Sequence, residues 1–272
     1  MVNGYMPTSL EEALQILASH QLVPYAGGTD LMVHPKEGVS YLFLHEIPEI
    51  RKIQEDERYI RIGAAVTYTE ALDSPLVPQV MKDAVLLIAA PAIRNAGTFG
   101  GNLGNGSPKA DTVLIEYATD AKLVIASIRG TRTIDVASFY QGRKKLDLAP
   151  DELITEILLP KKGLDRYFYQ KVGGRNALAI SRVSFCGIFQ EENGKITKVA
   201  SAFGAVADTV LRYPDLEQML VGKTIAEAKA LKPAYLKAYD ERMVLTKGRV
   251  SAEYRKEVCQ RLLDAFLTKF GI

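Results

Sequence analysis

Residues 97–106 read Gly-Thr-Phe-Gly-Gly-Asn-Leu-Gly-Asn-Gly, so half of these ten positions are glycine. A second cluster, Ala26-Gly27-Gly28-Thr29-Asp30-Leu31, follows a short apolar run. Glycine lacks a Cβ, so consecutive glycines allow positive φ values and let backbone N–H groups approach an anion closely. The interleaved Thr29, Thr98, Asn102 and Ser107 add hydroxyl and amide donors. Either cluster alone is equally a tight turn, but two in one chain favour a nucleotide cofactor with a diphosphate.

The hydrophobic pattern surrounds these clusters with mixed helices and strands. Apolar residues at 10, 13, 14 and 17 predict an amphipathic helix, with Thr8 and Glu11 as its capping box. The same reasoning predicts strands at 23–26, 41–44 and 59–62, helices at 76–90 and 112–119, a hairpin at 122–136 and a strand at 152–159. The element order therefore indicates a mixed α and β protein.

The C-terminal part has a different pattern, which begins after the polar stretch 161–165. Two strands are expected at 184–191 and 195–203, because Asn193-Gly194 between them is the strongest short hairpin signal. Residues 251–270 predict an amphipathic helix that ends at Gly271. We therefore place a domain boundary near residue 163, before a smaller unit of hairpin and helices.

Composition excludes several classes of protein. The 272 residues include 34 Lys and Arg against 32 Asp and Glu, and this near balance argues against nucleic acid or an anionic membrane as a partner. The longest apolar stretch, 84–93, contains Pro91 and is far shorter than the roughly 20 residues that cross a bilayer. The N-terminal residues lack the pattern of a secretory signal, so a cytoplasmic location is expected.

The metal-binding residue types are too few for a metal centre. Cys186 and Cys259 are the only cysteines, whereas an iron–sulfur cluster or a structural zinc needs about four ligands. The histidines at 20, 34 and 45 have no ligand spacing and are expected to be solvated or singly hydrogen-bonded. We expect no metal site in this chain.

Several motifs together resemble the FAD-binding subunit of molybdenum hydroxylases, the family of xanthine dehydrogenase, carbon monoxide dehydrogenase and nicotinate dehydrogenase. The motifs are Ala26-Gly27-Gly28-Thr29-Asp30-Leu31, Ile62-Gly63-Ala64-Ala65-Val66-Thr67, Ile93-Arg94-Asn95-Ala96-Gly97-Thr98-Phe99-Gly100-Gly101-Asn102, Ser107-Pro108-x-x-Asp111 and Lys171-Val172-Gly173-Gly174-Arg175. The segment Ser251-Ala252-Glu253-Tyr254-Arg255 is similar to the family's C-terminal signature. The resemblance covers nearly the whole chain.

The resemblance implies an α+β fold with two domains. Residues 1–163 would form a two-part FAD-binding domain of the p-cresol methylhydroxylase and vanillyl-alcohol oxidase type, with its two parts divided near residue 55. Residues 164–272 would form a small α+β domain of the carbon monoxide dehydrogenase flavoprotein type.

The resemblance also implies the cofactor site. Segments 24–31 and 98–102 would wrap the diphosphate, Asp111 would contact the FAD, and Ile88, Ile154 and Lys171 would lie beside it. The full set is Pro24, Tyr25, Ala26, Gly27, Gly28, Thr29, Asp30, Leu31, Ile88, Thr98, Phe99, Gly100, Gly101, Asn102, Ser107, Asp111, Ile154 and Lys171. Core packing is the alternative for the two isoleucines, and a solvated charge is the alternative for the lysine. Neither glycine loop has a Cys or His that could bind flavin covalently.

The implied function is electron transfer through noncovalently bound FAD. A flavin exchanges one or two electrons, so it couples a one-electron iron–sulfur chain to NAD or another acceptor. Hydroxylation would occur on a molybdopterin in a large subunit, with 2Fe-2S clusters in a small subunit, and dimerisation of the whole complex is left open. No catalytic residue beyond the flavin is expected here. Two alternatives are a stand-alone oxidase or dehydrogenase of the vanillyl-alcohol oxidase superfamily and a nucleotide-binding module without redox chemistry. The substrate cannot be read from this chain.

Overall fold

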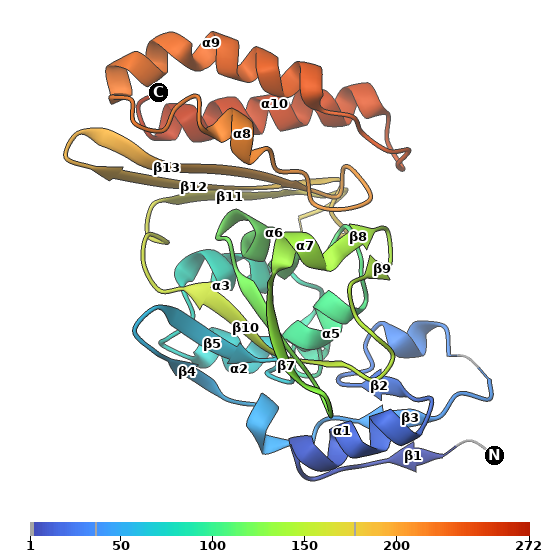
Figure 1. Ribbon diagram of the computed structural model, residues 1–272. Helices are drawn as coiled ribbons and strands as arrows, with labels where there is room; N and C mark the ends of the chain where they lie inside the picture. Colours follow the sequence, from blue (N-terminus) through green and yellow to red (C-terminus); the bar gives the residue numbers. More distant parts are fainter. Residues whose placement is uncertain (1–2, 36, 177) are drawn as a thin grey trace. The chain divides into compact units, whose positions relative to one another are not determined.

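The computed structural model describes residues 3–35, 37–176 and 178–272, which form two compact units (Figure 1). Neither unit is continuous in sequence. The first comprises Met1–Val77, Ala89–Ser107 and Asp120–Lys161, and the second comprises Pro78–Ile88, Pro108–Thr119 and Lys162–Ile272. The division of the chain near residue 163 stays a prediction, because the compact units do not follow a single cut in the sequence.

The first unit contains a small parallel sheet and one long helix. Its strands are ordered β1-β3-β2, with bounds Gly4–Tyr5, Tyr41–Phe43 and Val23–Tyr25. The helix α1 (Leu10–Ser19) buries Ala13, Leu14 and Leu17 in the hydrophobic cluster that includes Leu42 of β3. The packing of α1 on the sheet thereby fixes the end of β2, which lies directly before the first glycine cluster.

The predicted capping box of α1 is wrong by one residue. Ser9, not Thr8, is the N-cap, because its hydroxyl accepts a hydrogen bond from the backbone N–H of Glu12 at 3.2 Å. The Glu12 carboxylate in turn accepts from the backbone N–H of Thr8 at 2.8 Å. The pairs Thr8–Glu11 and Ser9–Glu12 both supply the hydroxyl and the carboxylate that a capping box requires, so the sequence is compatible with either register. The helix adopts the second.

The large sheet of the first unit is antiparallel, with order β4-β5-β10-β6-β7. The strands span Ile53–Glu55, Tyr59–Gly63, Leu153–Pro160, Lys122–Ser127 and Gly130–Asp135. The predicted hairpin is confirmed as β6 and β7; Gly130, at φ 126°, is the first residue of β7 and pairs with Ser127 directly after the two-residue turn 128–129. A β-bulge interrupts the pairing of β10 with β6 between Ile154 and Glu156.

Short elements complete the first unit. They are the helices α2 (Tyr68–Asp73), α4 (Pro91–Arg94), α5 (Phe99–Gly104) and α7 (Val136–Phe139), the 3₁₀ turns η1 (Leu31–Val33) and η2 (Pro48–Ile50), and the strand pair β8 (Tyr140–Gly142) and β9 (Lys145–Leu146). The glycine-rich segment is thus partly helical, although glycine disfavours helix. Burial of Phe99 and Leu103 and capping by Thr98 stabilise α5 against that preference.

The second unit is built on a three-stranded antiparallel sheet, β11-β12-β13, spanning Tyr167–Val172, Val183–Glu192 and Lys195–Gly204. The predicted hairpin is confirmed as β12 and β13. Its turn residues Asn193 and Gly194 both have positive φ, 51° and 73°, as a two-residue hairpin loop of this kind requires.

Helices cover both faces of this sheet (Figure 1). The helices α9 (Ile225–Arg242) and α10 (Ala252–Lys269) lie over one face, with Phe266 of α10 packed against Phe185 of β12. On the opposite face lies α6 (Asp111–Ala118), which also packs against α3 (Gln79–Leu86). The short α8 (Pro214–Glu217) joins β13 to α9.

The predicted helix at 76–90 is shorter in the structure. Pro78 is the N-cap of α3, and Leu87 ends the helix. Ala89 then adopts a positive φ of 41°, which is incompatible with a continuing helix. The polypeptide therefore leaves the second unit here and starts α4 of the first.

Candidate functional site

The two glycine clusters lie next to each other in the first unit. Gly27 packs directly on the backbone of residues 96–97, where an added Cβ would overlap the carbonyl oxygen of Ala96. A Cβ added at Gly101 would lie 3.8 Å from the Cβ of Ala26. Two segments that are about 70 residues apart in sequence are thereby brought together.

The first cluster presents a run of unused backbone donors. In the part of the chain that the structure describes, no N–H group from Ala26 to Leu31 donates a hydrogen bond. These residues are half-buried or exposed, so their six N–H groups are accessible to an acceptor that binds from outside. A loop of this kind forms an anion-binding concavity, and the oxygens of a diphosphate are suitable acceptors. The donor set therefore fits the implied cofactor.

Local packing fixes the shape of this loop. Gly28 has a φ of 67°, and an added Cβ would overlap the ring of Tyr25. The Tyr25 ring contacts Phe43 of β3 at 4.9 Å between ring centroids. After the loop, Asp30 is the N-cap of η1, but its side chain makes no capping hydrogen bond. The turn requires glycine at position 28, whereas the donors come from backbone and not from side chains.

The second cluster is ordered by its own helix. The Thr98 hydroxyl accepts a hydrogen bond from the N–H of Gly101 at 3.1 Å, so its own hydrogen remains for a second acceptor. Gly100 lies against Ala64, because its N–H donates to the Ala64 carbonyl at 2.8 Å. Asn102 and Ser107 both make further polar interactions with the protein. Among the predicted donors, Thr98 is thus also a structural cap.

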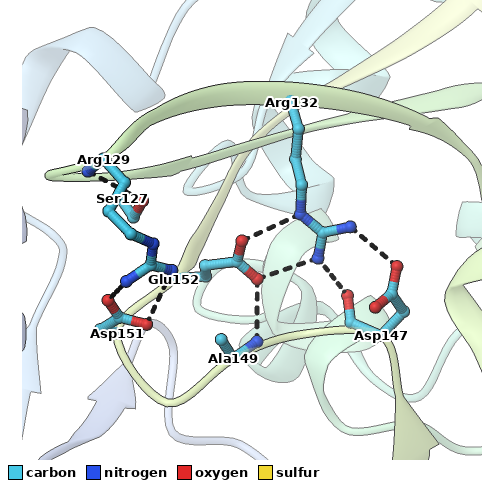
Figure 2. A network of polar contacts seen from close by, with 7 residues as sticks. All are labelled: Ser127, Arg129, Arg132, Asp147, Ala149, Asp151 and Glu152. Atoms are coloured by element: carbon cyan, nitrogen blue, oxygen red, sulfur yellow. Dashed lines mark hydrogen bonds and ion pairs between the residues drawn. The ribbon is translucent and has the colours of Figure 1, made fainter.

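Ile154 lies in β10 of the same unit, at the β-bulge, and is 8% exposed. A network of ion pairs holds the turn immediately before it (Figure 2). Arg132 makes a bidentate pair with Glu152 at 2.9 Å for both bonds and reaches Asp147 at 2.7 Å. The hydrogen bond to Arg132 is the main reason that the pKa of Glu152 lies below its ordinary value. This network fixes the start of β10 and therefore the place of Ile154.

Asp111 and Lys171 form a buried ion pair in the second unit. Lys171 Nζ lies 2.7 Å from Asp111 Oδ2, and both side chains are less than a tenth exposed. The same ammonium group donates to the carbonyl of Leu87 at 2.9 Å. The alternative of a solvated charge at Lys171 is therefore wrong. Burial raises the pKa of the Asp111 carboxyl, and Lys171 opposes that rise.

Two neighbours of this pair were missed by the sequence analysis. The hydroxyl of Ser181 donates to Asp111 Oδ1 at 2.9 Å. Tyr169, two residues before Lys171 on β11, has a buried hydroxyl with no hydrogen-bond partner in the described residues. Ser181 is 70 positions from Asp111, and nothing in either local sequence signals their contact. Only the alternation of side chains along a strand could have grouped Tyr169 with Lys171.

Ile88 follows α3 in the second unit and is partly exposed. Its N–H donates to the carbonyl of Val85 at 3.0 Å, so the backbone is held in the last turn of the helix. Both readings of its side chain, core packing and cofactor contact, remain compatible with partial burial.

The cysteines and histidines do not gather into a metal-binding cluster within the described residues. Cys186 and Cys259 are buried free thiols, and burial raises the pKa of Cys259 to about 12. His20 makes a hydrogen bond of 3.1 Å with the carbonyl of Ile16. Within the described ranges, no three His, Cys, Asp or Glu residues gather where they could hold a metal ion. Those ranges also contain no helix with the length and hydropathy of a membrane span.

Comparison with known families agrees with this geometry. Residues 1–162 match the FAD binding domain in molybdopterin dehydrogenase, and residues 167–270 match the CO dehydrogenase flavoprotein C-terminal domain. The chain belongs to the FAD-binding subunits of molybdenum hydroxylases. As an FAD-binding subunit of this family, it is part of an oxidoreductase, and its two-domain α+β fold is confirmed.

Curated relatives of this FAD-binding subunit cover most of the chain. It is 31% identical over 221 residues to the putative xanthine dehydrogenase FAD-binding subunit of Escherichia coli, covering 77% of this chain and 76% of the relative. It is 30% identical over 274 residues to the nicotinate dehydrogenase FAD-subunit of Eubacterium barkeri, covering 94% and 91%.

Among solved structures, the carbon monoxide dehydrogenase of Hydrogenophaga pseudoflava has the same fold. The TM-score is 0.89 at 24% sequence identity, over 98% of this chain and 96% of that chain. At this level of identity the likeness describes architecture only.

Proposed function

We propose that this FAD-binding subunit takes electrons from an iron–sulfur subunit and passes them to NAD or another acceptor. The observation that carries the proposal is the run of six unused N–H donors at residues 26–31, set against the second glycine cluster. Fixed donors without a fixed cation suit a diphosphate that carries a large organic group.

The residues implied by the resemblance take the following roles in this proposal. Loop 26–31 donates its N–H groups to the diphosphate, and segment 98–102 contributes the Thr98 hydroxyl and closes the other side. Pro24 and Tyr25 support the loop from β2. Ile154 provides an apolar wall from β10. Flavin, when bound, supplies the exchange of one or two electrons that the protein side chains cannot perform.

In the second unit, Asp111, Lys171 and Ile88 are the proposed cofactor residues. The Lys171 ammonium is held by Asp111 and the Leu87 carbonyl, so its position and charge are fixed in advance of binding. A fixed positive charge favours electron-rich states of a neighbouring group. Besides its proposed contact with the FAD, Asp111 positions Lys171, and it is itself held by a hydrogen bond from Ser181.

The proposed partners are a large molybdopterin subunit and a small subunit with 2Fe-2S clusters. The names of the relatives support this, since the nicotinate dehydrogenase FAD-subunit and the Hydrogenophaga carbon monoxide dehydrogenase medium chain are each named as one chain of several. The relatives are named for substrates as different as nicotinate, caffeine and carbon monoxide. This diversity supports the view that substrate choice belongs to another subunit.

The test is purification of the native complex. We expect one FAD for each copy of this chain, together with molybdenum and iron in two co-purifying polypeptides, and reduction of the flavin when substrate is added to the complex. A metal-free homo-oligomer from native cells that turns over an organic substrate by itself would overturn the proposal in favour of the stand-alone oxidase. A preparation that binds nucleotide without any reducible flavin would favour the non-redox module.

A further inference from the structure

The segment 63–68, which contains most of one motif of the family resemblance, contributes no residue to the proposed cofactor contacts. It leaves β5 and leads into α2, and it runs beside the second glycine cluster. Three backbone hydrogen bonds join the two segments: Tyr68 N–H to Gly97 at 3.0 Å, Phe99 N–H to Val66 at 3.3 Å and Gly100 N–H to Ala64 at 2.8 Å. The segment is therefore a support beneath the glycine cluster.

The support is itself fixed from the opposite side. The N–H of Ala64 donates to the carbonyl of Thr155 in β10 at 2.9 Å, and the N–H of Ala65 donates to Ile50 at 2.9 Å. Gly63 packs so closely on Ile50 that an added Cβ would overlap its carbonyl. At the far end, Thr67 and Glu70 form the capping box of α2. Residues 63–67 thus have little freedom to move away from the glycine cluster.

Ala64 is the point of closest approach between the two segments. A Cβ added at Gly100 would lie 2.6 Å from the Ala64 Cβ and 2.8 Å from the Ala64 carbonyl oxygen. Ala64 is 4% exposed, so its methyl group fills the space that remains. Any larger side chain at position 64 has to push the backbone of Gly100 outward, because the support cannot retreat.

We infer that Ala64 is a positioning residue for the diphosphate site, because only a side chain no larger than a methyl group lets segment 98–101 keep its place beside loop 26–31. The inference rests on the proposed function, in which these two segments bind the diphosphate. Gly101 directly follows the contact, and a Cβ added at Gly101 would lie 3.8 Å from the Cβ of Ala26 in the loop opposite. A displacement of Gly100 therefore changes the distance between segment 98–101 and loop 26–31.

The neighbouring Ala65 offers a matched control. It is 5% exposed, like Ala64, but its side chain belongs to the hydrophobic cluster around α1. Valine at either position adds two carbon atoms to a buried site, and overpacking of this size has similar costs for folding. Only the variant at position 64 is expected to change ligand binding beyond its effect on folding.

The experiment measures binding of FAD and of ADP to the flavin-free full chain, together with thermal melting. ADP carries the diphosphate without the flavin ring. We expect Ala64→Val to weaken both ligands by the same factor, about tenfold or more, and Ala65→Val to bind both like the parent. Ala64→Ser, which adds one atom, keeps the fold if valine does not and is expected to weaken both ligands severalfold. Ala64→Gly should retain parental affinity.

The outcomes separate the inference from the proposed function. The inference would be overturned if Ala64→Val, or Ala64→Ser where valine prevents folding, bound both ligands as tightly as Ala65→Val. It would also be overturned if these Ala64 variants lost affinity for FAD but not for ADP. Either result would leave the cofactor assignment intact. A parent chain that binds neither ligand would overturn the proposed diphosphate site itself.

Discussion

Replacement of Gly101 by alanine separates folding from cofactor binding more cleanly than any other change in the glycine clusters. An added Cβ meets the Thr98 hydroxyl oxygen at 3.0 Å and Ala26 Cβ at 3.8 Å. The first contact requires a shift of a few tenths of an ångström by a small hydroxyl group, and the second is ordinary packing. The apo-protein therefore has room for the methyl group.

The substitution is expected to have opposite effects on the stability of the apo-protein and on its affinity for FAD. Gly101 lies inside α5, where alanine is favoured over glycine by up to about 1 kcal/mol, so the free energy of unfolding of the apo-protein should stay level or rise. The proposed ligand approaches the backbone of the same residue closely. A methyl group in that contact should cost about 1 to 3 kcal/mol of binding free energy, which is roughly a five- to 150-fold loss of FAD affinity.

The assay is FAD titration of the flavin-free chain, with thermal melting of each apo-protein. Gly104→Ala is the control, because it lies in the same helix and an added Cβ there has no atom within 4 Å. Gly100→Ala is a contrasting variant that should lose stability, since its Cβ would clash with Ala64. If Gly101→Ala folds and binds FAD as tightly as Gly104→Ala, the second cluster is only a structural turn and the reasoning fails.

Three further predictions concern titration, the ion-pair network and the flavin linkage. Burial raises the pKa of Glu116 from 4.5 to about 8; the folded state therefore holds this proton more tightly, and the free energy of unfolding should fall as pH rises from about 4.5 to 8, by at most about 1.4 kcal/mol per pH unit. Glu116→Gln should flatten that part of a pH series of chemical denaturation, and an unchanged slope would contradict it. Arg132→Met should destabilise the protein by about 1 to 3 kcal/mol at pH 7, because it leaves the buried Glu152 unpaired, whereas Arg129→Gln, at a more exposed pair, should cost less than about 1 kcal/mol. Since Arg132 lowers the pKa of Glu152, the difference between these two variants should shrink as pH falls below about 4 in the same denaturation series. Acid precipitation should release FAD, not FMN, into the supernatant; flavin that stays with the precipitate would contradict noncovalent binding.

Local signals predicted the fold well wherever a residue's role depends on its near neighbours. The hairpin at Asn193-Gly194 was evident because both turn residues need positive φ. The helix α9 was missed, although Thr224 and Glu227 form its capping box, because Pro233 interrupts the pattern. The segment that forms α5 is predicted as a diphosphate-binding loop and not as a helix, since the stability of α5 comes from the burial of Phe99 and Leu103 and not from propensity.

The candidate site was predicted in part for the same reason. The glycines of the two clusters are visible in the sequence, but only the structure shows that the N–H groups of loop 26–31 have no acceptor among the described residues. The buried triad of Asp111, Lys171 and Ser181 depends on contacts across 60 and 70 positions. No local pattern encodes such contacts, so the serine could not have been found from this sequence alone.

The sheet β11-β12-β13 is covered on one face by helices that come from far earlier in the chain. A cut at the exposed Lys161-Lys162 link would therefore not yield an independent C-terminal fragment. The fragment would lack α3 and α6, and its sheet would expose the apolar surface that α6 now buries. Protease nicking at this link should instead leave two pieces that stay associated without a covalent bond. Once separated, the C-terminal piece should regain its fold only after it is mixed with the N-terminal piece.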